Sequence, residues 1–209
     1  MKRSLNGWLT YIGSISDKAM DLGLSRVKSA GAILDVLKLP SRVITVTGTN
    51  GKGSTTWYLG AVLERLGYTV DIYNSPHLLR FNERILIRGH EVADDVLTDA
   101  FEKTDEAMRK AGVALTFFEF TTLAALLIFK NDAPDFVILE IGLGGRLDAT
   151  NAVDSDAGIV VSIGLDHTGI LGNTVEDIAY EKSCIYRKNH PAVCSQENPP
   201  KTLLENSAV

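Results

Sequence analysis

Apolar residues along the chain follow two alternating patterns. Short, mostly β-branched runs are typical of strands buried on both faces, while longer stretches repeat an apolar residue every three or four positions, as helices do. The runs fall at 43–47, 70–73, 136–139 and 159–163, with a short arm at 84–87 and a last strand beginning at Val193. Helical stretches fall at 4–37 (two helices around a turn at 20–24), after residue 51, at 92–111, between residue 120 and Pro134, and at 174–186. This alternation predicts an α/β fold with a mainly parallel sheet flanked by helices.

Polar side chains follow several of the predicted strands. Lys52, Ser75, Glu140 and the pair Asp166 and His167 each come directly after an apolar run or within a few residues of it. Ligands of such sheets bind beyond the carboxyl ends of the strands. We therefore expect these side chains to surround one ligand site.

The run 43–47 leads into a glycine-rich turn, and a helical pattern follows the turn at once. Glycines let backbone N–H groups approach phosphate oxygens, a helix N-terminus adds partial positive charge, and Lys52 supplies a full one. The match to the pattern G-x-x-x-x-G-K-[ST] is imperfect, because Val46 holds the first glycine position and Gly53 the hydroxyl position. A glycine turn without a ligand is the alternative. The position between strand and helix favours a nucleotide phosphate, with Ser54 or Thr55 offering a hydroxyl toward magnesium.

Three other residues each allow a structural and a functional interpretation. Glu140 at a strand end can simply reach solvent, but beside a phosphate loop it is also where Mg²⁺ needs an oxygen ligand, and we favour the metal. His167 stays open between a structural hydrogen-bonding role and a second metal site, because imidazole is unusual around magnesium. From spacing alone, Lys182 is a solvent-facing lysine of a helix.

Composition narrows the class of protein. The chain has 209 residues, 45% of them hydrophobic and 22% charged, and a net charge of −5. No long basic run indicates a nucleic-acid partner, and no apolar run approaches the ~20 residues of a membrane span. The N-terminus lacks the apolar segment of a secretory signal, and Cys184 and Cys194 lack metal-type spacing. We expect a cytoplasmic protein with reduced cysteines.

Five motifs occur together along nearly the whole chain. They are GTNGKGS at 48–54, SPHL at 75–78, LEIGLGGRLDATN at 139–151, LDHT at 165–168 and EK at 181–182. Their order and spacing resemble the folylpolyglutamate synthase/dihydrofolate synthase family, the folate branch of the Mur ligase superfamily. Segments 22–27 and 115–120 also look like family segments. The resemblance implies the P-loop central domain of the Mur ligases.

The resemblance also implies a reaction. In that family ATP phosphorylates the carboxylate of a pteroate or folate, and the amine of L-glutamate then attacks the acyl phosphate. The expected ligands are ATP, two Mg²⁺ ions and potassium as a further candidate, with dihydropteroate or folate and L-glutamate as substrates. We expect a monomer.

Matching residues take over the family's roles. The resemblance implies that the ATP phosphates are bound by Thr49, Asn50, Gly51, Lys52, Gly53 and Ser54. It also implies that the first magnesium ion is bound by Ser75 and Glu140, and the second by His167. Lys182 matches a lysine that is carbamylated, and Lys52, Glu140, His167 and Lys182 form the expected catalytic set. The pterin-binding residues are expected to be Met20, Asp21, Leu22, Thr116, Phe117, Phe118, Glu119, Leu147, Asp148 and Ala149. In this scheme Phe118 flanks the flat pterin and Asp148 accepts its N–H donors, although Phe117, Phe118 and Phe120 equally suit a core.

The chain departs from the family in three respects. Cys184 stands near Lys182 where small residues are usual, and Ala152 replaces a larger aliphatic residue. Family members also carry a C-terminal Rossmann-like domain that contributes to glutamate binding. We expect residues 1–209 to be an incomplete N-terminal ATP- and pterin-binding domain, with that second domain absent. The alternative to a ligase is a truncated, catalytically incompetent nucleotide- and pterin-binding fragment. A cell-wall Mur ligase is disfavoured by the segment GLGGRLD at 142–148.

Overall fold

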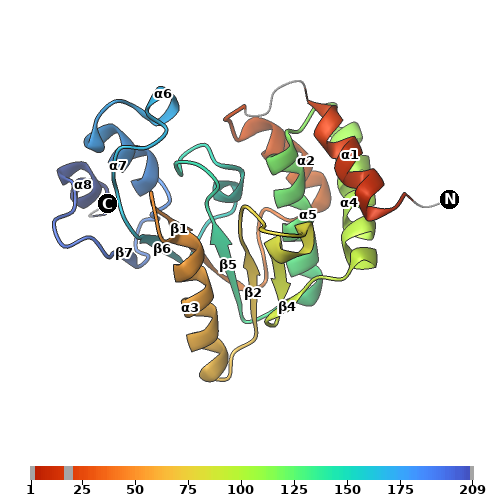
Figure 1. Ribbon diagram of the computed structural model, residues 1–209, viewed down its shortest axis with the longest axis horizontal. Coiled ribbons are helices and arrows are strands. Elements are labelled where there is room, and N and C mark those ends of the chain that lie inside the picture. The colour runs from red at the N-terminus through yellow and green to blue at the C-terminus, as the bar shows by residue number, and fades with distance from the viewer. Residues whose placement is uncertain (1–2, 17–20, 208–209) are drawn as a thin grey trace.

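The computed structural model describes residues 3–16 and 21–207, and in these residues a seven-stranded sheet forms the centre of the molecule (Figure 1). The strand order is β4-β3-β2-β5-β1-β6-β7. Strands β1, β2, β5, β6 and β7 run parallel, while β3 pairs antiparallel with β2 and with β4. The bounds are β1 Arg42–Thr47, β2 Val70–Tyr73, β3 Ile85–Ile87, β4 His90–Glu91, β5 Phe136–Glu140, β6 Ala157–Val160 and β7 Ala192–Cys194. The α/β class predicted from the sequence is confirmed.

Helices cover both faces of the sheet. One face, with Val43 and Leu139, packs against a layer made of α1 Leu5–Ile15, α2 Ser25–Leu34, α4 Asp94–Ala111 and α5 Phe117–Asp132. The opposite face, with Ile44 and Ile138, packs against α3 Lys52–Arg65. Helices α6 Thr168–Leu171, α7 Val175–Ser183 and α8 Lys201–Ser207 form a third cluster near β6 (Figure 1). Side chains that alternate along each strand thus reach two cores.

Helix ends follow from local sequence. At the start of α5 the Thr116 hydroxyl accepts the Glu119 backbone N–H, and the Glu119 carboxylate accepts the Thr116 backbone N–H, which forms a capping box. Thr174 and Asp177 form the same motif at the start of α7. Helix α3 begins after Gly51, whose φ of 84° lies in the left-handed region that favours glycine.

The structure corrects some expected element bounds. The run 159–163 was expected to be a strand, but β6 spans Ala157–Val160, because Ser162 turns away to bond with the loop after β1. Val62 in α3 and Leu66 just after it are 55% and 69% exposed, so the helical pattern after residue 51 includes apolar residues that are not buried. Helices α6 and α8 were not expected. Among the described helices, none combines the length and apolar character needed to cross a membrane.

Candidate functional site

The loop between β1 and α3 is hydrogen-bonded to the chain segment that follows β6. The Thr49 N–H donates to the Ser162 carbonyl at 2.8 Å, and the Asn50 N–H donates to the Ser162 hydroxyl at 3.0 Å. A Cβ on Gly48 would lie 3.1 Å from the Ser162 nitrogen, which is a tight contact, so glycine at residue 48 favours the close approach of the two segments. The loop therefore has a fixed shape at the carboxyl end of β1.

Lys52, the first residue of α3, folds back over this loop. Its Nζ donates to the carbonyls of Gly48 at 3.0 Å and Thr49 at 3.4 Å. The side chain lines a small cavity of about 30 Å³ together with Asp166, His167 and Lys182. The structure thus brings together three of the four expected catalytic residues.

Lys182 lies in α7 and is only 4% exposed, so the solvent-facing position expected from spacing alone is wrong. Burial, and next the positive charge of Lys52, lower the pKa of Lys182 to about 8. Asp166 and Asp148 partly oppose this shift. A large share of the amine is consequently neutral near pH 8, which is the form that acts as a nucleophile.

Glu140 ends β5 and is also buried, at 4% exposure. Its Oε2 accepts the Ser75 backbone N–H at 3.0 Å, and burial raises its pKa, although this bond and the charge of Lys52 oppose the rise. A Cβ on Gly53 would lie 3.8 Å from both Glu140 carboxylate oxygens, and the two residues line one cavity together with Ser75 and Trp57. A buried carboxylate facing open space fits a divalent cation, which prefers oxygen ligands.

His167 lies apart from Glu140. It precedes α6 with a φ of 47°, and its half-exposed ring has Nε2 3.8 Å from Asp166. The described residues contain no group of three or more His, Cys, Asp and Glu side chains that could hold a metal ion. Ser75 with Glu140, and His167, would each need phosphate oxygens or water to complete a magnesium site. The two metal assignments stay predictions.

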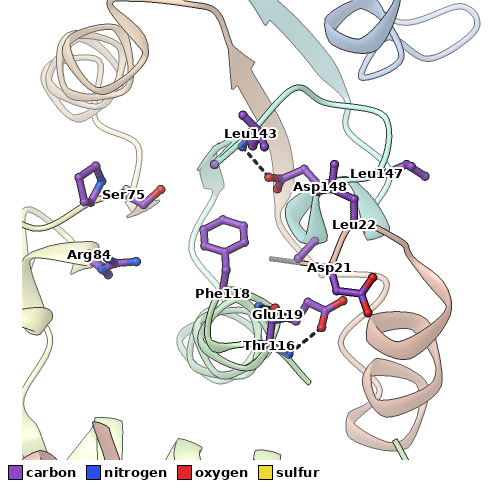
Figure 2. Close-up of a pocket in the computed structure, with 13 residues that line it drawn as sticks. Asp21, Leu22, Ser75, Arg84, Thr116, Phe118, Glu119, Leu143, Leu147 and Asp148 are labelled. Atoms are coloured by element: carbon purple, nitrogen blue, oxygen red, sulfur yellow. Dashed lines mark hydrogen bonds between the residues drawn. The ribbon is translucent and has the colours of Figure 1, made fainter. Parts of the chain in front are cut away.

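A further cavity, of about 270 Å³, has Ser75 in its wall (Figure 2). We call it the large cavity, because it exceeds the cavity of about 30 Å³ beside Lys52. Its walls come from the segment before α2, the loop after β2, the start of α5 and the loop after β5. It is lined by Asp21, Leu22, Ser75, Pro76, Arg84, Thr116, Phe118, Glu119, Gly142, Leu143, Leu147, Asp148 and Ala149. Eight of the ten expected pterin-binding residues therefore lie around one cavity.

The two exceptions are Met20 and Phe117. Met20 lies outside the described residues. Phe117, expected to contact the substrate, instead packs against Phe81 with ring centroids 6.1 Å apart. One helical step separates it from Phe118, so the two side chains leave α5 in different directions.

The Phe118 ring lies against the glycine-rich loop after β5. A Cβ on Gly142 would come within 2.7 Å of Phe118 Cζ, so this contact depends on glycine. Figure 2 shows the ring standing in the middle of the cavity. A flat apolar surface of this kind suits an aromatic ligand.

The buried carboxylates of the cavity already have partners within the protein. Glu119 pairs with Arg26 at 2.8 Å in addition to its capping bond. Asp148 is 2% exposed and accepts the Leu143 N–H at 2.9 Å and the Thr150 hydroxyl at 2.7 Å, while burial raises its pKa. Both residues thus fix the cavity wall, and contact between Asp148 and a pterin stays a prediction.

Sequence reasoning missed four cavity residues, which are Pro76, Arg84, Gly142 and Leu143. Leu143 lies inside the recognised glycine-rich motif and Pro76 beside Ser75, so their neighbours gave a signal. Arg84 follows no strand end and belongs to no motif. Only the path of the chain between β2 and β3 brings it to the cavity.

Comparison with known proteins places these features in a family context. Residues 46–208 match the Mur ligase middle domain. A dihydrofolate synthase/folylpolyglutamate synthase of Haemophilus influenzae is 48% identical over 200 residues, which are 96% of this chain and 45% of that protein. Escherichia coli FolC, solved in complex with DHPP and ADP, has a TM-score of 0.94 at 45% identity, over 98% of this chain and 49% of that chain.

A further solved relative is a bifunctional folylpolyglutamate synthase/dihydrofolate synthase with Mn, AMPPNP and L-glutamate bound. Its TM-score is 0.90 at 44% identity, over 98% of this chain and 49% of that chain. The chain thus spans about half the length of the relatives it matches.

Proposed function

Because the chain belongs to the dihydrofolate synthase/folylpolyglutamate synthase family of Mur ligases, we propose that it supplies the ATP and pterin sites of such a ligase. The proposed reaction adds L-glutamate to dihydropteroate, to tetrahydrofolate (poly)glutamates, or to both. An oxygen of the acid attacks the γ-phosphorus of ATP and ADP leaves. The glutamate amine then displaces phosphate from the acyl carbon and loses a proton.

One observation carries the proposal. Glu140 joins the two ligand sites, because it accepts the N–H of Ser75, which lines the large cavity, and also lies beside Gly53 of the phosphate loop. An acid held against Phe118 would therefore present its carboxylate close to the end of the nucleotide. Such proximity supplies a large part of the rate enhancement in two-substrate reactions.

Charge is the main obstacle to this chemistry, because carboxylate and γ-phosphate are both anionic. Lys52 and the backbone N–H groups at the start of α3 would stabilise the phosphate oxygens, whereas the N–H groups of Thr49 and Asn50 already donate to Ser162. Magnesium, held by Ser75 and Glu140, would reduce the remaining repulsion when bound. Lys182 lines the small cavity together with Lys52, and burial lowers the pKa of its amine to about 8.

Binding is the first test, and it separates the two ligand sites. The 209-residue chain should bind a non-hydrolysable ATP analogue with Mg²⁺, and also dihydropteroate, in calorimetric titrations. Lys52→Ala should weaken binding of the nucleotide by about 10-fold or more and leave the affinity for dihydropteroate unchanged. Lys28→Ala, at an exposed position, should change neither affinity. If Lys52→Ala binds the nucleotide as tightly as the parent, the assigned phosphate site is wrong.

A second candidate function follows from the fraction of the relatives that the chain covers. Because it spans about half of their length, it can bind both ligands without completing the reaction. Release of phosphate that depends on dihydropteroate and L-glutamate together would support the ligase. Binding without turnover would support the fragment.

A further inference from the structure

The large cavity has opposite charges at its two ends. Asp21, Glu119 and Asp148 lie on one side, and the Arg84 guanidinium lies on the other with Ser75 (Figure 2). No other lysine or arginine lines this cavity among the described residues. A ligand with a neutral, hydrogen-bonding head and an anionic tail would match this polarity.

Arg84 differs from the other arginines with similar exposure. The half-buried arginines of the described chain are Arg26, Arg84 and Arg187. Arg26 pairs with Glu119 at 2.8 Å, and Arg187 pairs with Asp154 at 2.6 Å. Arg84 pairs with no carboxylate of the described residues, although its positive charge acts on Glu140. A partly desolvated guanidinium without a counter-ion is unusual unless a ligand supplies one.

The Arg84 guanidinium is nevertheless held in place. Its Nε donates to His77 Nδ1 at 2.8 Å, and its Cζ lies 5.6 Å and 5.7 Å from the ring centroids of Phe81 and Phe117. Within the described residues, its two terminal nitrogens have no hydrogen-bond acceptor. These contacts fix the planar group before a ligand arrives, which lowers the entropy lost on binding.

We propose that Arg84 is the residue that binds the carboxylate of the acid substrate, through its two terminal nitrogens. This inference rests on the proposed function and adds the orientation of the ligand. The neutral ring system lies toward Asp148, its flat face against Phe118, and the acid end lies toward Arg84 and Ser75. Arg84 then aims the reacting carboxylate at the nucleotide and selects acids over neutral analogues.

The test compares two ligands that differ only in charge at this end. Dihydropteroate and its carboxamide are titrated into the parent chain, Arg84→Gln and Arg84→Lys. Arg84→Gln should weaken binding of the acid by about 10- to 100-fold and change binding of the carboxamide by less than about 2-fold. Arg84→Lys keeps the positive charge but loses the planar group that donates two parallel hydrogen bonds, so its loss of affinity for the acid should be intermediate. Exposed Arg65→Gln serves as the control.

A purely structural Arg84 gives a different result. If Arg84→Gln weakens both ligands equally, or weakens neither, the proposal is overturned while the proposed function stands. If the parent binds neither ligand, the proposed pterin site fails and this inference fails with it. Should Arg84→Gln not fold, Arg84→Lys and a salt titration of the parent decide, because only binding of the acid should weaken as salt rises.

Discussion

The Glu140 carboxylate accepts the Ser75 backbone N–H at 3.0 Å, and this bond ties the end of β5 to the loop after β2. The loop after β2 lines the large cavity, while Glu140 also lies beside Gly53 of the proposed phosphate loop. The proposed ATP and pterin sites, which are built from separate strands, therefore meet at one buried carboxylate.

Glu140→Gln should separate metal binding from folding. Gln has almost the same shape and retains an oxygen that can accept the Ser75 N–H, but it lacks the charge that magnesium needs. Because burial opposes ionisation of Glu140, we expect unchanged or slightly higher thermal stability. Affinity for the ATP analogue in the presence of Mg²⁺ should fall by about 10-fold or more. Exposed Glu102→Gln is the control, and unaltered magnesium dependence in Glu140→Gln would contradict the metal assignment.

Gly142→Ala should disturb the large cavity through a single contact. The added Cβ would lie 2.7 Å from Phe118 Cζ, so the ring must move. We expect a loss of about 1–3 kcal/mol in the free energy of unfolding and weaker binding of dihydropteroate. Gly169→Ala has no atom within 4 Å of the new Cβ and serves as the control.

A double variant identifies the cause of that effect. Phe118→Leu removes the clash, so stability should change less when Gly142→Ala is introduced into Phe118→Leu than into the parent. Strict additivity of the two effects in urea unfolding would show that the Phe118 contact is not the cause.

Asp71 should make stability depend on pH. It is fully buried in β2, and burial, followed by the charge of Asp132, raises its pKa from 3.8 to about 7. The folded chain therefore binds this proton more tightly than the unfolded chain, so the contribution of Asp71 is complete below pH 4 and is lost as pH rises through 7. Asp71→Asn keeps an acceptor for the Arg88 N–H, now bonded to Asp71 Oδ1.

Asp71→Asn should raise the free energy of unfolding by about 2–4 kcal/mol at pH 8 and change it little at pH 4. Urea unfolding at the two pH values measures the difference, with exposed Glu197→Gln as the control. A gain of equal size at both pH values would rule out titration of Asp71 as the cause.

Carbamylation of Lys182 can be observed directly. Because burial lowers the pKa of this amine to about 8, much of it is neutral at pH 8 and open to CO₂. A ¹³C carbamate resonance should appear when the chain is exchanged into ¹³C-bicarbonate, and Lys182→Arg should lose it. Lys188→Arg, an exposed position, should retain it. A resonance that persists in Lys182→Arg would place the modification elsewhere.

The sequence predicts those parts of the molecule that local pattern determines. The runs that became β1, β2 and β5 are buried along almost their whole length, and Thr174, which caps α7, lies beside its helix in sequence. The grouping of Phe118 and Asp148 around one cavity follows from motifs that the resemblance provided.

Other features depend on contacts between distant segments. Lys182 is buried because α7 packs beside the phosphate loop, and no spacing within α7 indicates this. Strand β6 ends early because Ser162 bonds to Asn50, which lies more than a hundred residues away. Arg84 reaches the cavity only through the turn that pairs β3 with β2. Tertiary packing decided each of these outcomes.

The central claim is that the large cavity and the phosphate loop are two halves of one site. Solid-state NMR dipolar recoupling can test it, with dihydropteroate ¹³C-labelled at its carboxyl carbon and a non-hydrolysable ATP analogue bound to the same chain with Mg²⁺. We predict a distance within about 5 Å between that carbon and the γ-phosphorus, because the reacting oxygen must lie about 3–3.5 Å from its target. Both ligands bound with no detectable coupling, at a separation beyond about 8 Å, would contradict it.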